Sequence, residues 1–216
     1  VTDKSGNNTT ASVTYTIEKA TPTANDFTFQ PPTDLTYNGN SKTATVTSSK
    51  NGMGQVTVRY YQNGNSVEAP KDAGTYTVKI SVADGTNYKA VNDLSYSDWK
   101  FTISPNSTAP TVILSGDMVY NSQQIRPEVT VTIGGTALVQ GTDYTVAYGE
   151  NKKAGETAGS VTITATGNYS FAQVVETFKI AKRPITVTAE NKSSRVGPSL
   201  VTLTYPPTEG LPYPGD

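Results

Sequence analysis

The chain is built from short runs in which apolar and polar residues alternate. In the run 56–61, Val56, Val58 and Tyr60 share one parity, and Thr57, Arg59 and Tyr61 share the other. Alternation with a period of two predicts strands that bury one face. The further inward rows predicted in this way are Tyr76, Val78, Ile80 and Val82; Trp99, Phe101 and Ile103; Val129, Val131 and Ile133; Tyr144, Val146 and Tyr148; Val161, Ile163 and Ala165; and Val174, Phe178 and Ile180.

Turn-forming pairs separate these runs. They are Asn51-Gly52, Asn63-Gly64, Asp84-Gly85 and Gly134-Gly135. Such pairs favour tight hairpin turns, and no helical period persists beyond about two turns. Strands joined by short turns form antiparallel sheets, and two such sheets bury their apolar faces against each other. The predicted fold class is therefore all-β.

The strand pattern also repeats along the chain. Three closing strands end alike, at residues 13–17, 99–103 and 176–180, and each precedes a short polar stretch that contains Pro. Their spacing of about 80 residues suits an immunoglobulin-like sandwich. Shorter echoes keep the same order: residues 35–38 correspond to 118–121, residues 72–78 to 157–163, and Asn87-Tyr88 to Asn168-Tyr169.

The repeats predict how the chain is divided. We expect residues 20–104 and 105–181 to form two complete immunoglobulin-like antiparallel β-sandwiches in an extended tandem array. Residues 1–19 are predicted to be the tail strand of a preceding repeat, and residues 182–216 the truncated first half of another. Because the chain opens at Val1 without a leader pattern, we expect an internal segment of a longer protein. Each incomplete end is expected to pack on a sheet, since unpaired strand edges seek partners.

Composition narrows the classes of function. The 216 residues carry 17 Lys and Arg against 18 Asp and Glu, with no His and no Cys. A net charge of −1 gives no attraction to nucleic acid or to an anionic membrane. The missing His and Cys remove the usual general base, the commonest metal ligand and any disulfide. No apolar run approaches the roughly 20 residues of a membrane span. We therefore expect no enzyme, no cofactor, no nucleic-acid partner and no membrane insertion.

Several short motifs resemble a known family. The matching runs in the second repeat are Tyr120-Asn121 and residues 141–146, 158–163, 167–169 and 177–180. They resemble the bacterial immunoglobulin-like repeats found in tandem on large surface proteins. Residues 184–216 resemble the opening half of a related repeat, the MBG domain. Residues 20–104 are similar to the immunoglobulin-like repeats more loosely, through Tyr37-Asn38-Gly39, residues 73–76 and Asn87-Tyr88. The resemblance implies an extracellular or bacterial cell-surface setting.

Tyrosines are the candidate binding residues. The chain has 13 Tyr but only 5 Phe and 1 Trp. Tyr60, Tyr61 and Tyr88 are candidates for a surface on which sugar rings stack, and Tyr61 points away from the apolar row. The alternative is structural, because Tyr suits half-buried sheet positions with its ring packed and its hydroxyl wet. Trp99 shares parity with Phe101 and is expected in the core.

Carboxylates are the remaining chemical candidates. Most lie beside Gly or Asn, where Asp commonly bonds its own backbone, and none forms a calcium-binding cluster. Glu176 differs, because it falls on the inward parity between Val174 and Phe178. It can pair with a Lys, or a bulge can turn it outward. Surface stalks of the resembled type sometimes carry an isopeptide crosslink, for which a buried Glu beside Lys and Asn is suited.

Two functional hypotheses follow. The first is a non-catalytic stalk or spacer segment, whose partners are the neighbouring repeats of the same chain and whose short Pro-containing linkers stiffen the array. The second is an adhesin or carbohydrate-binding module that presents Tyr-rich surfaces to a host glycan or protein.

Overall fold

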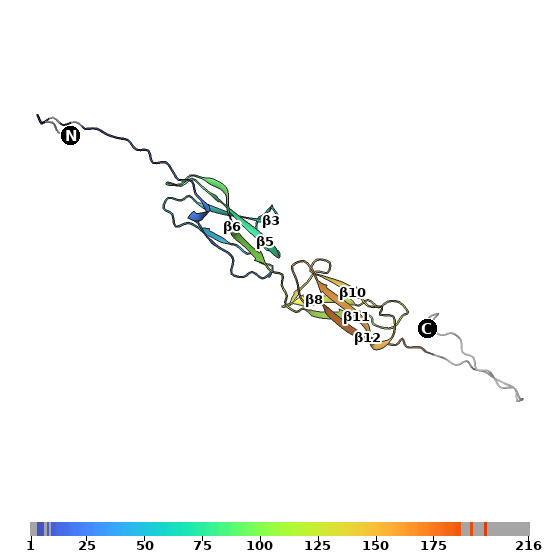
Figure 1. Cartoon of the computed structure of the whole chain (residues 1–216). Helices are drawn as coiled ribbons and strands as arrows, with labels where there is room; N and C mark the ends of the chain where they lie inside the picture. Colours follow the sequence, from blue (N-terminus) through green and yellow to red (C-terminus); the bar gives the residue numbers. More distant parts are fainter. Residues whose placement is uncertain (1–3, 7, 9, 187–190, 192–196, 198–216) are drawn as a thin grey trace. The chain divides into compact units, whose positions relative to one another are not determined.

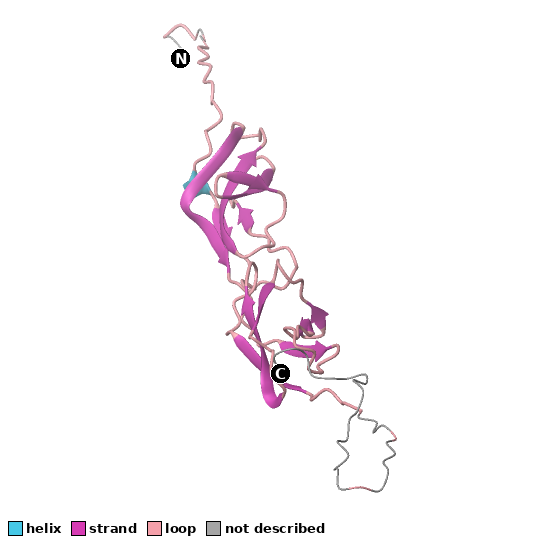
Figure 2. Ribbon diagram, turned by 90° about the vertical axis from the view of Figure 1, so that its right-hand side faces the viewer, coloured by secondary structure: helices cyan, strands magenta, loops and turns pink. Residues whose placement is uncertain are grey.

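The computed structural model describes residues 4–6, 8, 10–186, 191 and 197. The chain divides into two compact units, Val1–Ser104 and Pro105–Asp216, which are described separately (Figure 1). The described residues form antiparallel sheets and one short 3-10 helix, η1 (Ala24–Asp26), with no α-helix (Figure 2). None of these elements is a helix of the length and apolarity that a membrane crossing requires. The predicted all-β class is confirmed.

The first unit contains two sheets. Their strands are β1 (Thr28–Gln30), β2 (Thr45–Thr47), β3 (Val56–Gln62), β4 (Asn65–Val67), β5 (Gly74–Val82) and β6 (Val91–Ile103). One sheet pairs β1 with β2, and the other has the order β4-β3-β5-β6. Every pair of neighbours is antiparallel.

The apolar rows of the first unit meet in one core. Val78 and Ile80 of β5 are 1% and 0% exposed, so the predicted inward parity is confirmed. Trp99 of β6 packs against two rings, with Phe27, which follows η1, edge-on and Phe29 of β1 stacked; each ring centroid is 6.3 Å away. Aromatic packing at these distances joins the two sheets through Trp99.

The second unit also contains two sheets. Their strands are β7 (Thr111–Ser115), β8 (Glu128–Ile133), β9 (Thr136–Ala137), β10 (Tyr144–Tyr148), β11 (Gly155–Ala165) and β12 (Val174–Ile180). The sheet orders are β7-β8-β9 and β10-β11-β12. Val161 and Ile163 of β11 are fully buried, as their parity predicts.

A buried amide holds one corner of the second unit. Asn151 is 2% exposed, and its side chain bridges two segments. Its Nδ2 donates to the carbonyl oxygens of Ile125 (3.0 Å) and Ser160 (3.1 Å), and its Oδ1 accepts from the amide of Ser160 (2.8 Å). Burying an amide is tolerated because each of these polar atoms has a partner.

Each unit contains a sheet with the same order of three strands, and the two units differ in where the hairpin strand is added. The order β3-β5-β6 in the first unit matches β10-β11-β12 in the second. The hairpin strand β4 extends this sheet, whereas β9 extends the opposite sheet through its pairing with β8. Both hairpins use the predicted Asn63-Gly64 and Gly134-Gly135 turns, in which both residues have positive φ.

The predicted strand at 13–17 is not formed. These residues belong to no strand of the described chain, and the side chains of Val13, Tyr15 and Ile17 are all exposed, Ile17 by 95%. The expectation that this end packs on a sheet is therefore wrong within a single chain; packing on a second copy stays a prediction. Alternation shows that a segment suits a strand, but a strand forms only where a neighbouring strand takes up its backbone hydrogen bonds. The corresponding prediction for the C-terminal end falls almost wholly outside the described residues.

Candidate functional site

Tyr60, the first of the three candidate tyrosines, lies in the core. It is 6% exposed. Its hydroxyl accepts a hydrogen bond from the amide of Ala44 (2.9 Å) and donates one to the carbonyl oxygen of Ala44 (3.2 Å). Burial raises the pKa of this hydroxyl above its ordinary value. The Tyr60 ring therefore packs the core and is not offered to a surface ligand.

Tyr61 and Tyr88 are half-buried and lie at opposite ends of the sheet. Tyr61 pairs with Thr77, and the amine of Lys79 lies 4.8 Å from its ring centroid. Tyr88 follows the other end of β5, beyond Val82. The five residue steps from Thr77 to Val82 span roughly 17 Å at the usual rise of a strand. The two rings therefore do not form one stacking platform.

Two carboxylates of the first unit, those of Asp26 and Asp34, have a lowered pKa, which favours their ionised form. Asp26 forms a capping box with Thr23, whose backbone hydrogen bond is the main cause of the lowered pKa of Asp26. Hydrogen bonding from Lys42 likewise lowers the pKa of Asp34. A general acid needs a raised pKa, so neither group suits that role. The described residues contain no group of three or more His, Cys, Asp or Glu that is arranged to hold a metal ion.

Lys42 and Asp34 form an ion pair with one buried member. The side chain of Lys42 is 6% exposed and that of Asp34 is 57% exposed. Asn38 also donates to Asp34, from Nδ2 to Oδ2 at 2.9 Å. Forming an amide between Lys and Asp requires a neutral amine and a protonated carboxyl, whereas the lowered pKa keeps Asp34 charged. Glu176, the sequence candidate for such chemistry, is half-buried opposite Val161.

Short parallel backbone bridges close the first unit at both ends. At the entry bridge, the amide of Ala20 donates to the carbonyl oxygen of Asn87 (2.9 Å), and the amide of Lys89 donates to the carbonyl oxygen of Ala20 (2.8 Å). At the exit bridge, the amide of Ser104 donates to the carbonyl oxygen of Leu35 (2.7 Å), and the amide of Tyr37 donates to the carbonyl oxygen of Ser104 (2.9 Å). Both pairings are parallel, unlike those of the sheets.

The second unit has the same two bridges. At its entry bridge, Asn106 donates to Asn168 (2.9 Å) and accepts from Ser170 (2.8 Å), through backbone atoms. At its exit bridge, the amide of Ala181 donates to Met118 (2.8 Å), and the amide of Tyr120 donates to Ala181 (2.9 Å). These pairings are also parallel. The sequence echoes at 35–38 and 118–121, and at Asn87-Tyr88 and Asn168-Tyr169, therefore mark equivalent partners in the two units.

Matching side chains fix the inner partner of each exit bridge. Oδ1 of Asp34 accepts from the amide of Thr36, and Oδ1 of Asp117 accepts from the amide of Val119, both at 3.1 Å. An Asx turn of this kind sets the backbone just before the bridge. The sequence signal was visible as the shared order Asp, apolar residue, β-branched residue, Tyr and Asn, although the sequence alone did not reveal the bridges.

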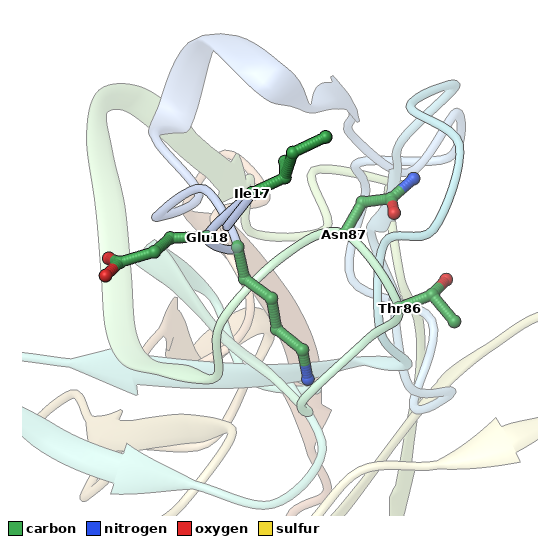
Figure 3. Close-up of a pocket in the computed structure, with 5 residues that line it drawn as sticks. Ile17, Glu18, Thr86 and Asn87 are labelled. Carbon is green, nitrogen blue, oxygen red and sulfur yellow. The ribbon is translucent and has the colours of Figure 1, made fainter. Parts of the chain in front are cut away.

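A small hollow lies beside the entry bridge of the first unit. It measures about 130 Å³ and is lined by Ile17, Glu18, Lys19, Thr86 and Asn87. Drug-sized ligands occupy about 300–1,000 Å³, so this hollow is too small for them. Figure 3 shows the side chain of Glu18 pointing away from those of Thr86 and Asn87, so these polar groups do not converge.

Ion pairs span the entry bridge of the first unit. Lys19 pairs with Asp84, and Lys89 lies 3.8 Å from Glu18. These side chains are 38–80% exposed, so each pair contributes little energy and is weakened by salt. The bridge itself is defined by the backbone hydrogen bonds, and the ion pairs flank it.

Comparison with known proteins gives one family match. The family model of the MBG domain matches residues 32–95, which lie in the first unit. The sequence resemblance placed this family at 184–216, and that position is not confirmed. No curated protein and no solved structure matches the chain. The chain is therefore similar to an MBG repeat over the strands β2 to β5 and part of β6.

Proposed function

We propose that the chain is a non-catalytic spacer segment of a bacterial cell-surface or secreted protein that holds a distal domain away from the envelope. Its complete repeats are residues 20–104 and 105–181, each an immunoglobulin-like β-sandwich. Residues 1–19 end a preceding repeat, and residues 182–216 begin an MBG-like one. The partners of this segment are the neighbouring repeats of the same chain.

Two features support the immunoglobulin-like assignment. The order β4-β3-β5-β6, with β1 and β2 on a second sheet, suits a sandwich of antiparallel sheets. The hydroxyl of Tyr76, near the start of β5, donates to the carbonyl oxygen of Asp72 (2.8 Å). A Tyr that bonds to backbone a few residues upstream is a recurrent corner of such sandwiches.

The observation that carries the spacer proposal is the length of the connection. Ser104 is bonded in the exit bridge of the first unit, and Asn106 is bonded in the entry bridge of the second. Only Pro105 lies between them. Proline fixes its own φ, so the connection has few free torsions. A connection of one constrained residue suits a spacer, because a long flexible linker would let the distance between the two ends of the segment vary widely.

The binding-module alternative has less support. It needs aromatic rings on a common surface, and Tyr60 is buried whereas Tyr61 and Tyr88 lie at opposite ends of the sheet. A glycan-binding experiment tests this alternative. Binding of the full chain to a defined glycan on an array, abolished by Tyr61→Ala, would favour the adhesin over the spacer.

Small-angle X-ray scattering of the full chain tests the spacer proposal. The test variant carries eight Gly and Ser residues inserted after Pro105. The control carries the same insertion between Asn63 and Gly64, in the turn of a hairpin. We expect the native chain and the control to give the same narrow distribution of long distances, and the test variant a broader one. A native distribution as broad as that of the test variant would show that the units swing freely and would refute the proposal.

A further inference from the structure

We propose that the entry and exit bridges are the contacts of each unit that resist tension along the chain, and that this tension loads them in shear. The inference rests on the proposed spacer function, because a spacer between a surface and a distal domain is pulled by its two ends. Each bridge joins residues of one unit, so the geometry does not depend on how the units are placed.

The entry bridge of the first unit lies on the direct path of a pulling force. Tension on the N-terminal side pulls Ala20 backwards along its strand direction. Tension on the C-terminal side pulls Ser104 forwards, and β6 carries that force to the segment 87–89 just before it. Because Ala20 and Tyr88 are paired in parallel, the two pulls act in opposite directions along one axis. Both hydrogen bonds of the bridge must then fail together.

The exit bridge is a second barrier behind the first. Once the entry bridge has opened, tension from the N-terminal side first reaches Phe27, which packs on Trp99, and β1, which is paired with β2. Beyond β1 it reaches Thr36. Thr36 is paired in parallel with Ser104, where the other end of the unit is pulled. The two hydrogen bonds of the exit bridge are therefore again loaded together, along the strand axis. The sheet β4-β3-β5-β6 is reached only after this second bridge fails.

An unzipping geometry in the same unit gives the contrast. Gly74 and Ile103 are paired at one end of the antiparallel strands β5 and β6. Pulling these strands apart from that end loads the ladder one pair at a time, because the force is perpendicular to the strands. The same fold should therefore be strong along its ends and weak across β5 and β6.

The second unit repeats the arrangement with different side chains. Asn106 is paired in parallel with Tyr169, just before β12, and Val119 with Ala181, just after β12. The ion pairs that flank the entry bridge of the first unit involve Lys19 and Lys89, and Pro105 stands in the second unit where Lys19 stands in the first. What the two units share is the backbone pattern, so the proposal assigns the resistance to the backbone.

Single-molecule pulling of the full chain tests the proposal. Since the chain has no Cys, introduced cysteines give unique handles. One version is pulled through its two ends, and another through Lys71→Cys and Pro105→Cys, which opens β5 from β6. We expect end-pulling to require the higher force and to unfold the first unit in two steps. The first step should release residues 20–26, which precede the packed Phe27 and β1, roughly 25 Å of chain at about 3.5 Å per residue.

Proline substitutions locate the resistance. Ala20→Pro removes the donor to Asn87, and Thr21→Pro is the matched control, because the Thr21 amide takes no part in the bridge. Ala20→Pro should speed the first step about fivefold, the factor that one backbone hydrogen bond of about 1 kcal/mol represents. The second unit in the same trace should not change.

Two results would overturn the proposal, and the first of them needs no proline variant. Equal forces in the two pulling directions would show that the native bridges carry no special load. Equal effects of Ala20→Pro and Thr21→Pro would assign the first step to other contacts. Neither result changes the distance distribution that the scattering experiment measures, so failure of this inference is distinguishable from failure of the spacer proposal.

Discussion

Replacing Trp99 with Ala tests whether the aromatic contact between the two sheets of the first unit determines its stability. Trp99 is 5% exposed and packs on Phe27 and Phe29. Truncating a large buried aromatic side chain costs about 3–5 kcal/mol, from lost transfer energy and from the cavity left behind. Native domains are stable by about 5–15 kcal/mol, so this loss removes a large part of the stability of the unit.

Urea unfolding followed by circular dichroism measures the loss. With a urea dependence of about 1–1.5 kcal/mol per molar, the midpoint of the first unit should fall by roughly 2–5 M. The milder variant Trp99→Phe keeps a ring between Phe27 and Phe29 and should lose less. The transition of the second unit is the internal control and should keep its midpoint. A loss below about 1 kcal/mol would refute the reasoning and return Trp99 to the candidate surface residues.

Two further predictions concern polar groups. The pKa of Asp34 is lower in the folded chain than in the unfolded chain, so its contribution to stability is present above about pH 4 and is lost as the pH falls below that value; Asp34→Asn should flatten this part of the urea midpoint measured against pH, and an unchanged acid limb would contradict the role of the Lys42 pair. Asn151→Ala should destabilise the second unit by about 2–4 kcal/mol, because it leaves the backbone groups of Ile125 and Ser160 without their partners; the fluorescence of Trp99, which reports the first unit, should unfold at the same urea concentration as before.

The core could be predicted from the sequence because parity is a local signal. Val78, Ile80, Val161 and Ile163 are buried as their alternation predicts, since each residue step turns a strand side chain to the other face. The turn at Asn63-Gly64 was equally accessible, because its positive φ values demand such residues. These features depend on neighbours in sequence.

Features that depend on distant partners were not predictable in the same way. The strand expected at 13–17 has the right parity but no partner strand among the described residues. Tyr60 looked like a surface candidate because its pairing with Ala44 lies 16 positions away. The parallel bridges use backbone atoms, which carry no side-chain signature, so Ala20 and Ser104 are inconspicuous in the sequence. Only their partners gave a signal, as the echo of Asn87-Tyr88 by Asn168-Tyr169.

The single residue between the bridges also affects how the chain withstands digestion. A protease must bind several successive residues in extended form before it can cut, and cleavage concentrates where the backbone is exposed and unbonded. Ser104 and Asn106 are each tied by two backbone hydrogen bonds, which leaves Pro105 alone between them. A proteolytic enzyme would have to open one bridge before it could engage this connection. The joint between the units, usually the first place where a multidomain chain is cut, is thus protected by the same bonds that end one unit and begin the next.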